Sequence, residues 1–147
     1  MGIDIHGWVE RLYEEDNSRR YWGGVISIYM LVERHYEMFH LLFGRGKISD
    51  VPPLAAGRGL PDDLSEEAWR DADDGAVVSP SWIVWNELDA IPWEERNGVM
   101  VHITDSGAEL EDRITLNAGW AALFDMMRLL ADRFGQSNVR LVAWFDS

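Results

Sequence analysis

Hydrophobic and polar residues alternate at both ends of the chain. Side chains of a strand point in turn to its two faces. Residues 3–13 therefore predict a strand with one apolar face, Ile3, Ile5 and Val9, and one face made of Asp4, His6, Trp8 and Glu10. Residues 139–146 alternate in the same way and predict a terminal strand. Strands at both ends indicate a sheet that is built partly from the chain termini.

The other strands are predicted by short β-rich runs between turn residues. A polar turn at 14–18 and a second strand at 23–30 indicate a hairpin with the first strand. The segment 79–81 breaks the chain before a short strand at 82–85, which runs into a helical turn through Leu88 and Ile91. A strand at 99–104, a turn at 105–107 and a short strand at 113–116 complete the set.

Three helices are predicted from the spacing of apolar residues and from capping residues. The first begins at Glu33 and ends at Gly44, and the longest begins after Asn117 and ends at Gly135. A short acidic helix runs from Asp63, its predicted N-cap, to about residue 74, with Trp69 as the residue that anchors it to the core. The connection at 44–63 is rich in glycine and proline and predicts a long loop.

These elements alternate without internal repeats over 147 residues, a length that suits one core. We expect a single globular domain, residues 1–147, of the α+β class. Its sheet should be mainly antiparallel, include both chain termini and pack against two or three helices.

The composition limits the kinds of metal site, and the sequence shows no targeting or membrane-spanning segment. The chain has no cysteine, so any metal would be held by His, Asp and Glu. The sequence has no basic segment followed by an apolar stretch, so we expect no secretion signal. It has no run of eighteen apolar residues, so we expect no membrane span. We therefore expect a cytoplasmic location.

The net charge of −13 is concentrated in one region. Residues 61–112 hold fifteen acids and two bases, whereas the segments on either side are nearly balanced. Such a region repels nucleic acid and attracts a protein with a basic surface, although a solvated helix face is the plainer interpretation. Candidate partner-binding residues are Glu66, Glu67, Asp71, Asp73, Glu94 and Glu95. The oligomeric state does not follow from the sequence.

Asp4, His6 and Asp146 are the first candidate site. If the two terminal strands are neighbours, two carboxylates and an imidazole converge and could bind a divalent cation that activates water. The alternative is a structural cluster in which His6 donates a hydrogen bond to a carboxylate or a carbonyl. We favour the structural cluster, because no recognised ligand spacing occurs, and we predict no cofactor.

The loop around Arg58 is the second candidate site. Arg58 could hold a carboxylate or phosphate that Asp62 and Asp63 orient; in the alternative, which we favour, Asp63 caps a helix and Arg58 pairs with an acid. A phosphate-binding loop and a serine-hydrolase motif are both missing, so binding is favoured over catalysis. The chain holds eight tryptophans, and we expect most, including Trp120 and Trp144, in the core. A subset could instead stack on a ligand or a partner: Trp8, Trp22, Trp82, Trp85 or Trp93.

Five motifs resemble a family of small bacteriophage and actinobacterial proteins that open Met-Gly-x-Asp-Ile-His. They are residues 1–6, Arg34-His35-Tyr36 for the family's Arg-Asn-Tyr, Arg-Gly-Leu-Pro-Asp-Asp at 58–63, Ser-Pro-Ser-Trp at 79–82, and the closing residues 139–146 with Trp-Phe-Asp. The resemblance spans nearly the whole chain but brings no substrate. Phage members have histidines around the Ser-Trp segment, where this chain has Val78 and Pro80.

Two functions follow as expectations. In the first, a phage or prophage accessory protein binds a host or defence protein through residues 61–112, as a counter-defence inhibitor or a nucleic-acid mimic. In the second, a pocket binds a nucleotide-like ligand or supports metal-assisted hydrolysis. Its residues would be Asp4, His6, Arg34, Tyr36, Arg58 and Asp146, with Asp62, Asp63 and Trp82 as further polar-cluster candidates.

Overall fold

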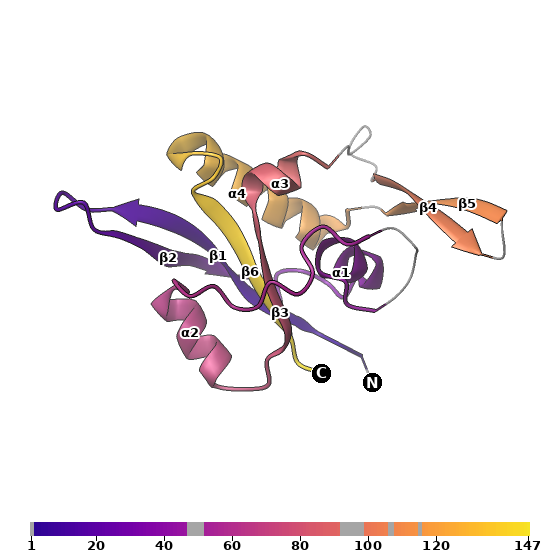
Figure 1. The fold of residues 1–147 in the computed structure, drawn as a ribbon, viewed down its shortest axis with the longest axis horizontal. Coiled ribbons are helices and arrows are strands. Elements are labelled where there is room, and N and C mark those ends of the chain that lie inside the picture. Colours follow the sequence, from indigo (N-terminus) through magenta and orange to yellow (C-terminus); the bar gives the residue numbers. More distant parts are fainter. Residues whose placement is uncertain (1, 47–51, 92–98, 106–107, 115) are drawn as a thin grey trace.

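The computed structural model describes residues 2–46, 52–91, 99–105, 108–114 and 116–147, and between residues 99 and 114 it describes the backbone alone. A four-stranded antiparallel sheet in the order β2-β1-β6-β3 forms its centre (Figure 1). The strands are β1 (Ile5–Glu14), β2 (Arg20–Ser27), β3 (Val78–Val84) and β6 (Val139–Phe145). Strands from the two ends of the chain are thus the two central strands, and the expected α+β fold is confirmed.

The register of the two central strands determines which residues share a face. His6 lies opposite Trp144, Trp8 opposite Val142, and Glu10 opposite Arg140. Because directly opposed residues point to the same side of a sheet, these six side chains share one face.

Three predicted strands differ from the observed ones by three or more residues at one or both ends. β2 begins at Arg20 and ends at Ser27, and a bulge opposite Val9 and Glu10 interrupts its pairing with β1. β3 already begins at Val78, because its pairing with β6 is irregular between Val78 and Ser81 and so tolerates Pro80 in an edge strand. The second sheet is a hairpin of β4 (Val99–Asp105) and β5 (Ala108–Ile114), so β5 begins well before the predicted strand at 113–116.

One face of the sheet packs against α1 (Tyr36–Phe43), α3 (Trp85–Asp89) and α4 (Ala118–Phe134), and this layer holds the main core. Phe39 contacts Trp120 and Phe145 edge-on. α1 begins after His35, whose Nδ1 accepts the Met38 N–H, and not at Glu33. Trp120 is fully buried, as expected.

The opposite face is covered by the short helix α2 (Glu66–Asp73). Trp144 and Val142 are buried between this helix and the sheet, so β6 is buried on both faces. The residues of α2 that face the sheet are the small Ala68 and Ala72.

Two predictions about α2 were wrong. Ser65, and not Asp63, caps it, with its hydroxyl accepting the Ala68 N–H at 3.2 Å. Trp69 does not anchor the helix, since it is 55% exposed. The inward face of this helix is set by Ala68 and Ala72, four residues apart, and Trp69 points away from that face. None of the described helices has the length and apolar character that crossing a membrane requires.

Candidate functional site

Five of the predicted site residues meet where the two chain termini lie side by side. Arg34 donates from Nε and Nη2 to the two carboxylate oxygens of Asp4, at 2.6 and 3.2 Å. Asp146 accepts the Asp4 backbone N–H at 3.1 Å and lies 3.4 Å from the His6 Nε2. The Tyr36 hydroxyl accepts the Ile3 N–H. The five side chains therefore lie together and contact one another or the backbone of the same chain.

Asp4 is the best-paired acid of this terminal cluster. Its hydrogen bond with Arg34 lowers the pKa of the Asp4 carboxyl below its ordinary value, and the same contact raises the pKa of Arg34. His6 stacks on the Tyr29 ring, with centroids 4.6 Å apart. Within the part of the chain that the structure describes, no group of three or more His, Asp or Glu residues could hold a metal ion.

The second candidate site lies in a hollow between the loop at 58–63 and strand β3. Four predicted residues line it, together with Leu60, Pro61 and Arg140: Arg58, Asp62, Asp63 and Trp82. Arg58 does not point freely into this hollow. Its guanidinium donates to both carboxylate oxygens of Glu87, at 2.8 and 2.7 Å. Arg58 therefore pairs with an acid, as in the alternative interpretation of this loop. The polar candidates form two separate groups, one at the chain termini and one around Arg58.

Glu87 holds both Arg58 and the start of α3. Its Oε1 accepts the Val84 N–H at 3.3 Å. The hydrogen bond from Arg58 lowers the pKa of the Glu87 carboxyl, with the Val84 N–H acting in the same direction, and raises the pKa of Arg58. The Arg58 backbone N–H in turn donates to the hydroxyl of Ser81, a buried residue, which fixes the loop on β3.

The predicted partner-binding residues Glu66, Glu67, Asp71 and Asp73 all lie on α2. Glu94 and Glu95 lie outside the described residues. The helix contains one basic residue, Arg70, which pairs with Glu66 on its outer side.

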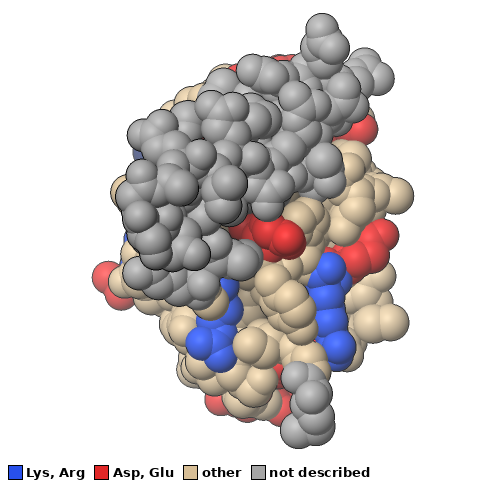
Figure 2. Space-filling view, turned by 90° about the vertical axis from the view of Figure 1, so that its right-hand side faces the viewer, with Lys and Arg blue, Asp and Glu red and all other residues tan. Residues whose placement is uncertain are grey.

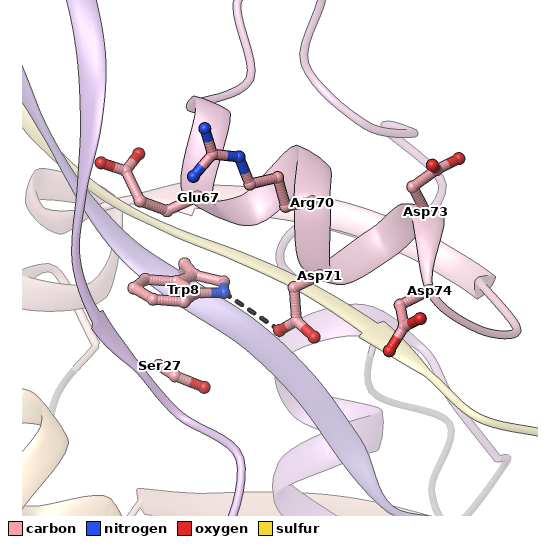
Figure 3. A pocket seen from close by; sticks show the side chains of 7 residues that line it. All are labelled: Trp8, Ser27, Glu67, Arg70, Asp71, Asp73 and Asp74. Atoms are coloured by element: carbon pink, nitrogen blue, oxygen red, sulfur yellow. Dashed lines mark hydrogen bonds between the residues drawn. The ribbon is translucent and has the colours of Figure 1, made fainter.

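A hollow of about 480 Å³ that is wide open to solvent lies along one side of α2, where the helix meets Trp8 and Ser27 of the sheet (Figure 3). Trp8 lies under the helix, and its indole N–H donates to Asp71 at 3.0 Å. Glu67 accepts the Gly24 N–H at 3.2 Å. Asp73, Asp74, Arg70 and Ser27 line the rest of the hollow.

A buried ion pair positions α2, and the sequence did not reveal it. Arg140 Nε donates to Glu10 Oε1 at 2.7 Å, and the side chains are 5% and 0% exposed. The other oxygen of Glu10 accepts the Ser65 N–H at 2.8 Å, and Arg140 also donates to Asp63 at 2.9 Å. The pair therefore ties the first turn of α2 and its preceding loop to the two central strands. The only signal in the sequence was the position of Glu10 and Arg140 within alternating strands.

Charge on the molecule is not uniform. On the face that Figure 2 shows, described basic and acidic residues lie next to each other among uncharged ones. On α2, by contrast, four carboxylates stand against one guanidinium. This helix and the hollow beside it are therefore an acid-rich part of the described structure.

Comparisons with models of protein families, with curated proteins and with solved structures gave no match.

Proposed function

We propose that this protein acts by binding a partner protein with a basic surface through α2. The proposed binding surface, called the α2 surface below, consists of Glu66, Glu67, Trp69, Arg70, Asp71 and Asp73. The resemblance to bacteriophage and actinobacterial proteins suggests the setting, an accessory protein that binds a host or defence protein. The second expectation, a ligand or hydrolytic pocket around Asp4, His6 and Asp146, stays a prediction.

The observation that carries this proposal is the exposure of Trp69. Trp69 is 55% exposed on an eight-residue helix that also carries four carboxylates, so it offers a partner a large apolar contact surrounded by charge. Tryptophan is enriched among the residues that dominate binding energy, and surrounding charges steer the approach of a partner.

The rigidity of α2 supports the same proposal. Glu10 of the sheet accepts the N–H of the capping residue before the helix. Asp71 in the middle of the helix binds Trp8, and Glu67 binds the Gly24 N–H. A surface that is fixed before binding loses less conformational entropy when a partner docks. The carboxylates of a rigid helix can also stand in for the phosphates of a nucleic acid. Mimicry of a nucleic acid would therefore use the same surface.

Affinity capture from the lysate of an actinobacterial host tests the proposal. The bait is the full chain, and the test variant carries Glu66→Lys, Trp69→Ala and Asp73→Lys, three substitutions at exposed positions. The matched control carries Asp125→Lys and Asp132→Lys on the exposed face of α4. We expect the wild type and the control to capture the same basic proteins from the lysate. The α2 variant should fail to capture them. Capture of the same proteins by all three would overturn the proposal.

A further inference from the structure

The α2 face of the sheet carries one tryptophan on each of its four strands. The strand register places Trp22 of β2, Trp8 of β1, Trp144 of β6 and Trp82 of β3 on this side. Trp144 is buried, whereas each of the other three lines a separate hollow on this side of the sheet.

Two of these tryptophans hold an arginine of the chain itself. The Arg140 guanidinium lies 4.0 Å from the centre of the Trp22 ring, and that of Arg58 lies 4.7 Å from the centre of the Trp82 ring. Each guanidinium also binds a carboxylate at 2.7 Å, Arg140 that of Glu10 and Arg58 that of Glu87. The same unit of tryptophan, guanidinium and carboxylate thus occurs twice, with both tryptophan rings on the α2 side of the sheet.

The unit is stable for physical reasons that do not depend on the fold. The ring face of tryptophan attracts a cation, and the planar guanidinium can stack on the ring while it donates to a carboxylate. Bonds between guanidinium and carboxylate are charge-assisted and are stronger than neutral hydrogen bonds.

At the third tryptophan, Trp8, a carboxylate binds the indole N–H and not, as in the other two units, a guanidinium on the ring. Asp71 binds its indole N–H, and Glu67, Asp73 and Asp74 line the same hollow. Among the described residues, no arginine lies over the Trp8 ring. Arg70 lines the hollow, but its guanidinium binds Glu66, and its side chain is 73% exposed.

We infer that the Trp8 hollow receives an arginine side chain of a partner polypeptide, with its guanidinium on the Trp8 ring and its N–H groups on the carboxylates of α2. This inference rests on the proposed function and names the chemistry of the partner. The hollow is open to solvent, and its volume of about 480 Å³ lies in the range of small-molecule sites. The four carboxylates of the hollow favour a cation, and the planar ring favours guanidinium over ammonium.

Indole N–H resonances provide the direct test. The probe is the peptide acetyl-Gly-Gly-Arg-Gly-Gly-amide, titrated into the full chain while the Trp8 indole signal, assigned through Trp8→Phe, is followed by two-dimensional NMR. The control peptides replace arginine by lysine, or by citrulline, which keeps the shape but not the charge. We expect a saturable shift of the Trp8 signal with the arginine peptide, a weaker one with lysine and none with citrulline.

Three variants locate the effect. Trp8→Phe weakens the contact with the ring, and we expect binding of the arginine peptide to weaken about two- to fivefold. Asp74→Asn removes a carboxylate of the hollow and should also weaken binding, whereas Asp132→Asn on α4 should leave it unchanged. Asp71→Asn removes a second negative charge of the hollow and should also weaken binding of the arginine peptide. The dispersion of the NMR spectrum of this variant shows whether the protein folds.

The outcomes separate this inference from the proposed function. Absence of a saturable Trp8 shift, equal shifts with arginine and citrulline, or binding that Asp74→Asn leaves intact would each overturn the arginine site. If the α2 variant loses the captured partner and Trp8→Phe keeps it at full affinity, the proposed function stands and the arginine site falls. If the peptide binds at Trp8 but capture does not depend on α2, the proposed function falls alone.

Discussion

Arg140 and Glu10 lie directly opposite each other on the two central strands and form an ion pair that is almost completely shielded from water. The pair has a further partner on each side, the Ser65 N–H for Glu10 and Asp63 for Arg140. Since Ser65 caps α2, this single contact links the centre of the sheet to the proposed binding surface.

Removal of one member of the pair is expected to destabilise the fold strongly. Glu10→Ala leaves the guanidinium of Arg140 buried without its main carboxylate, and breaking a buried pair costs about 3–5 kcal/mol. The free energy of unfolding, measured by urea titration, should fall by that amount. Glu66→Ala is the control, because its pair with Arg70 is exposed on both sides and should contribute less than about 1 kcal/mol. Equal losses in the two variants would contradict the role of the buried pair.

The N-cap of α2 gives a second prediction that separates the sequence-based expectation from the structure. Ser65→Ala should destabilise the protein by about 1 kcal/mol, because the Ala68 N–H loses its acceptor. Amide hydrogen exchange should rise in the first turn of α2. Faster exchange there in Asp63→Ala but not in Ser65→Ala would support the cap at Asp63 instead.

A third prediction concerns the close approach of α2 and β2. A Cβ at Gly24 would lie 2.8 Å from the Glu67 Cβ and 3.0 Å from the Trp8 Cε3. Gly24→Ala should therefore displace α2 and lower the free energy of unfolding by about 1–3 kcal/mol. Gly75→Ala is the matched control, since a Cβ there meets no atom within 4 Å. A neutral effect of Gly24→Ala in thermal unfolding would show that the helix is not held this tightly.

The fourth prediction is a pH dependence that Glu87 causes. Its pKa is lowered in the folded protein by Arg58, from an ordinary value of 4.5. A lowered pKa means that the pair stabilises the fold above the unfolded-state pKa and that this contribution disappears as the pH falls through the lower folded-state value. The stability difference between the wild type and Glu87→Gln should be constant above about pH 6 and shrink on acidification below the ordinary value. A difference that grows between pH 5 and pH 2, measured by chemical denaturation, would reverse the sign of this effect.

The long periodic elements were predictable from the sequence, and contacts between distant segments were not. The alternation in β1 and β6 and the apolar spacing in α4 predicted these elements and the meeting of Asp4 with Asp146. The ion pair of Glu10 and Arg140 joins residues 130 positions apart, and only the strand register brings them together.

Local ambiguity explains the errors around α2. Asp63 and Ser65 are both good capping residues, and Asp63 binds Arg140, a contact that no local pattern shows. In an eight-residue helix one tryptophan dominates any estimate of the apolar face, yet the two alanines pack where the sheet approaches closely. The exposed Trp69, which suggests a binding role, was therefore interpreted as a core residue.

The most direct measurement of the central claim is the dissociation constant of one purified partner from the capture experiment, determined by isothermal titration calorimetry at two salt concentrations. If Trp69 is the anchor of the α2 surface, Trp69→Ala should weaken binding by about tenfold or more, Asp132→Ala should leave it unchanged, and binding by the wild type should weaken at high salt. Affinity that is independent of both Trp69 and salt would contradict binding through α2.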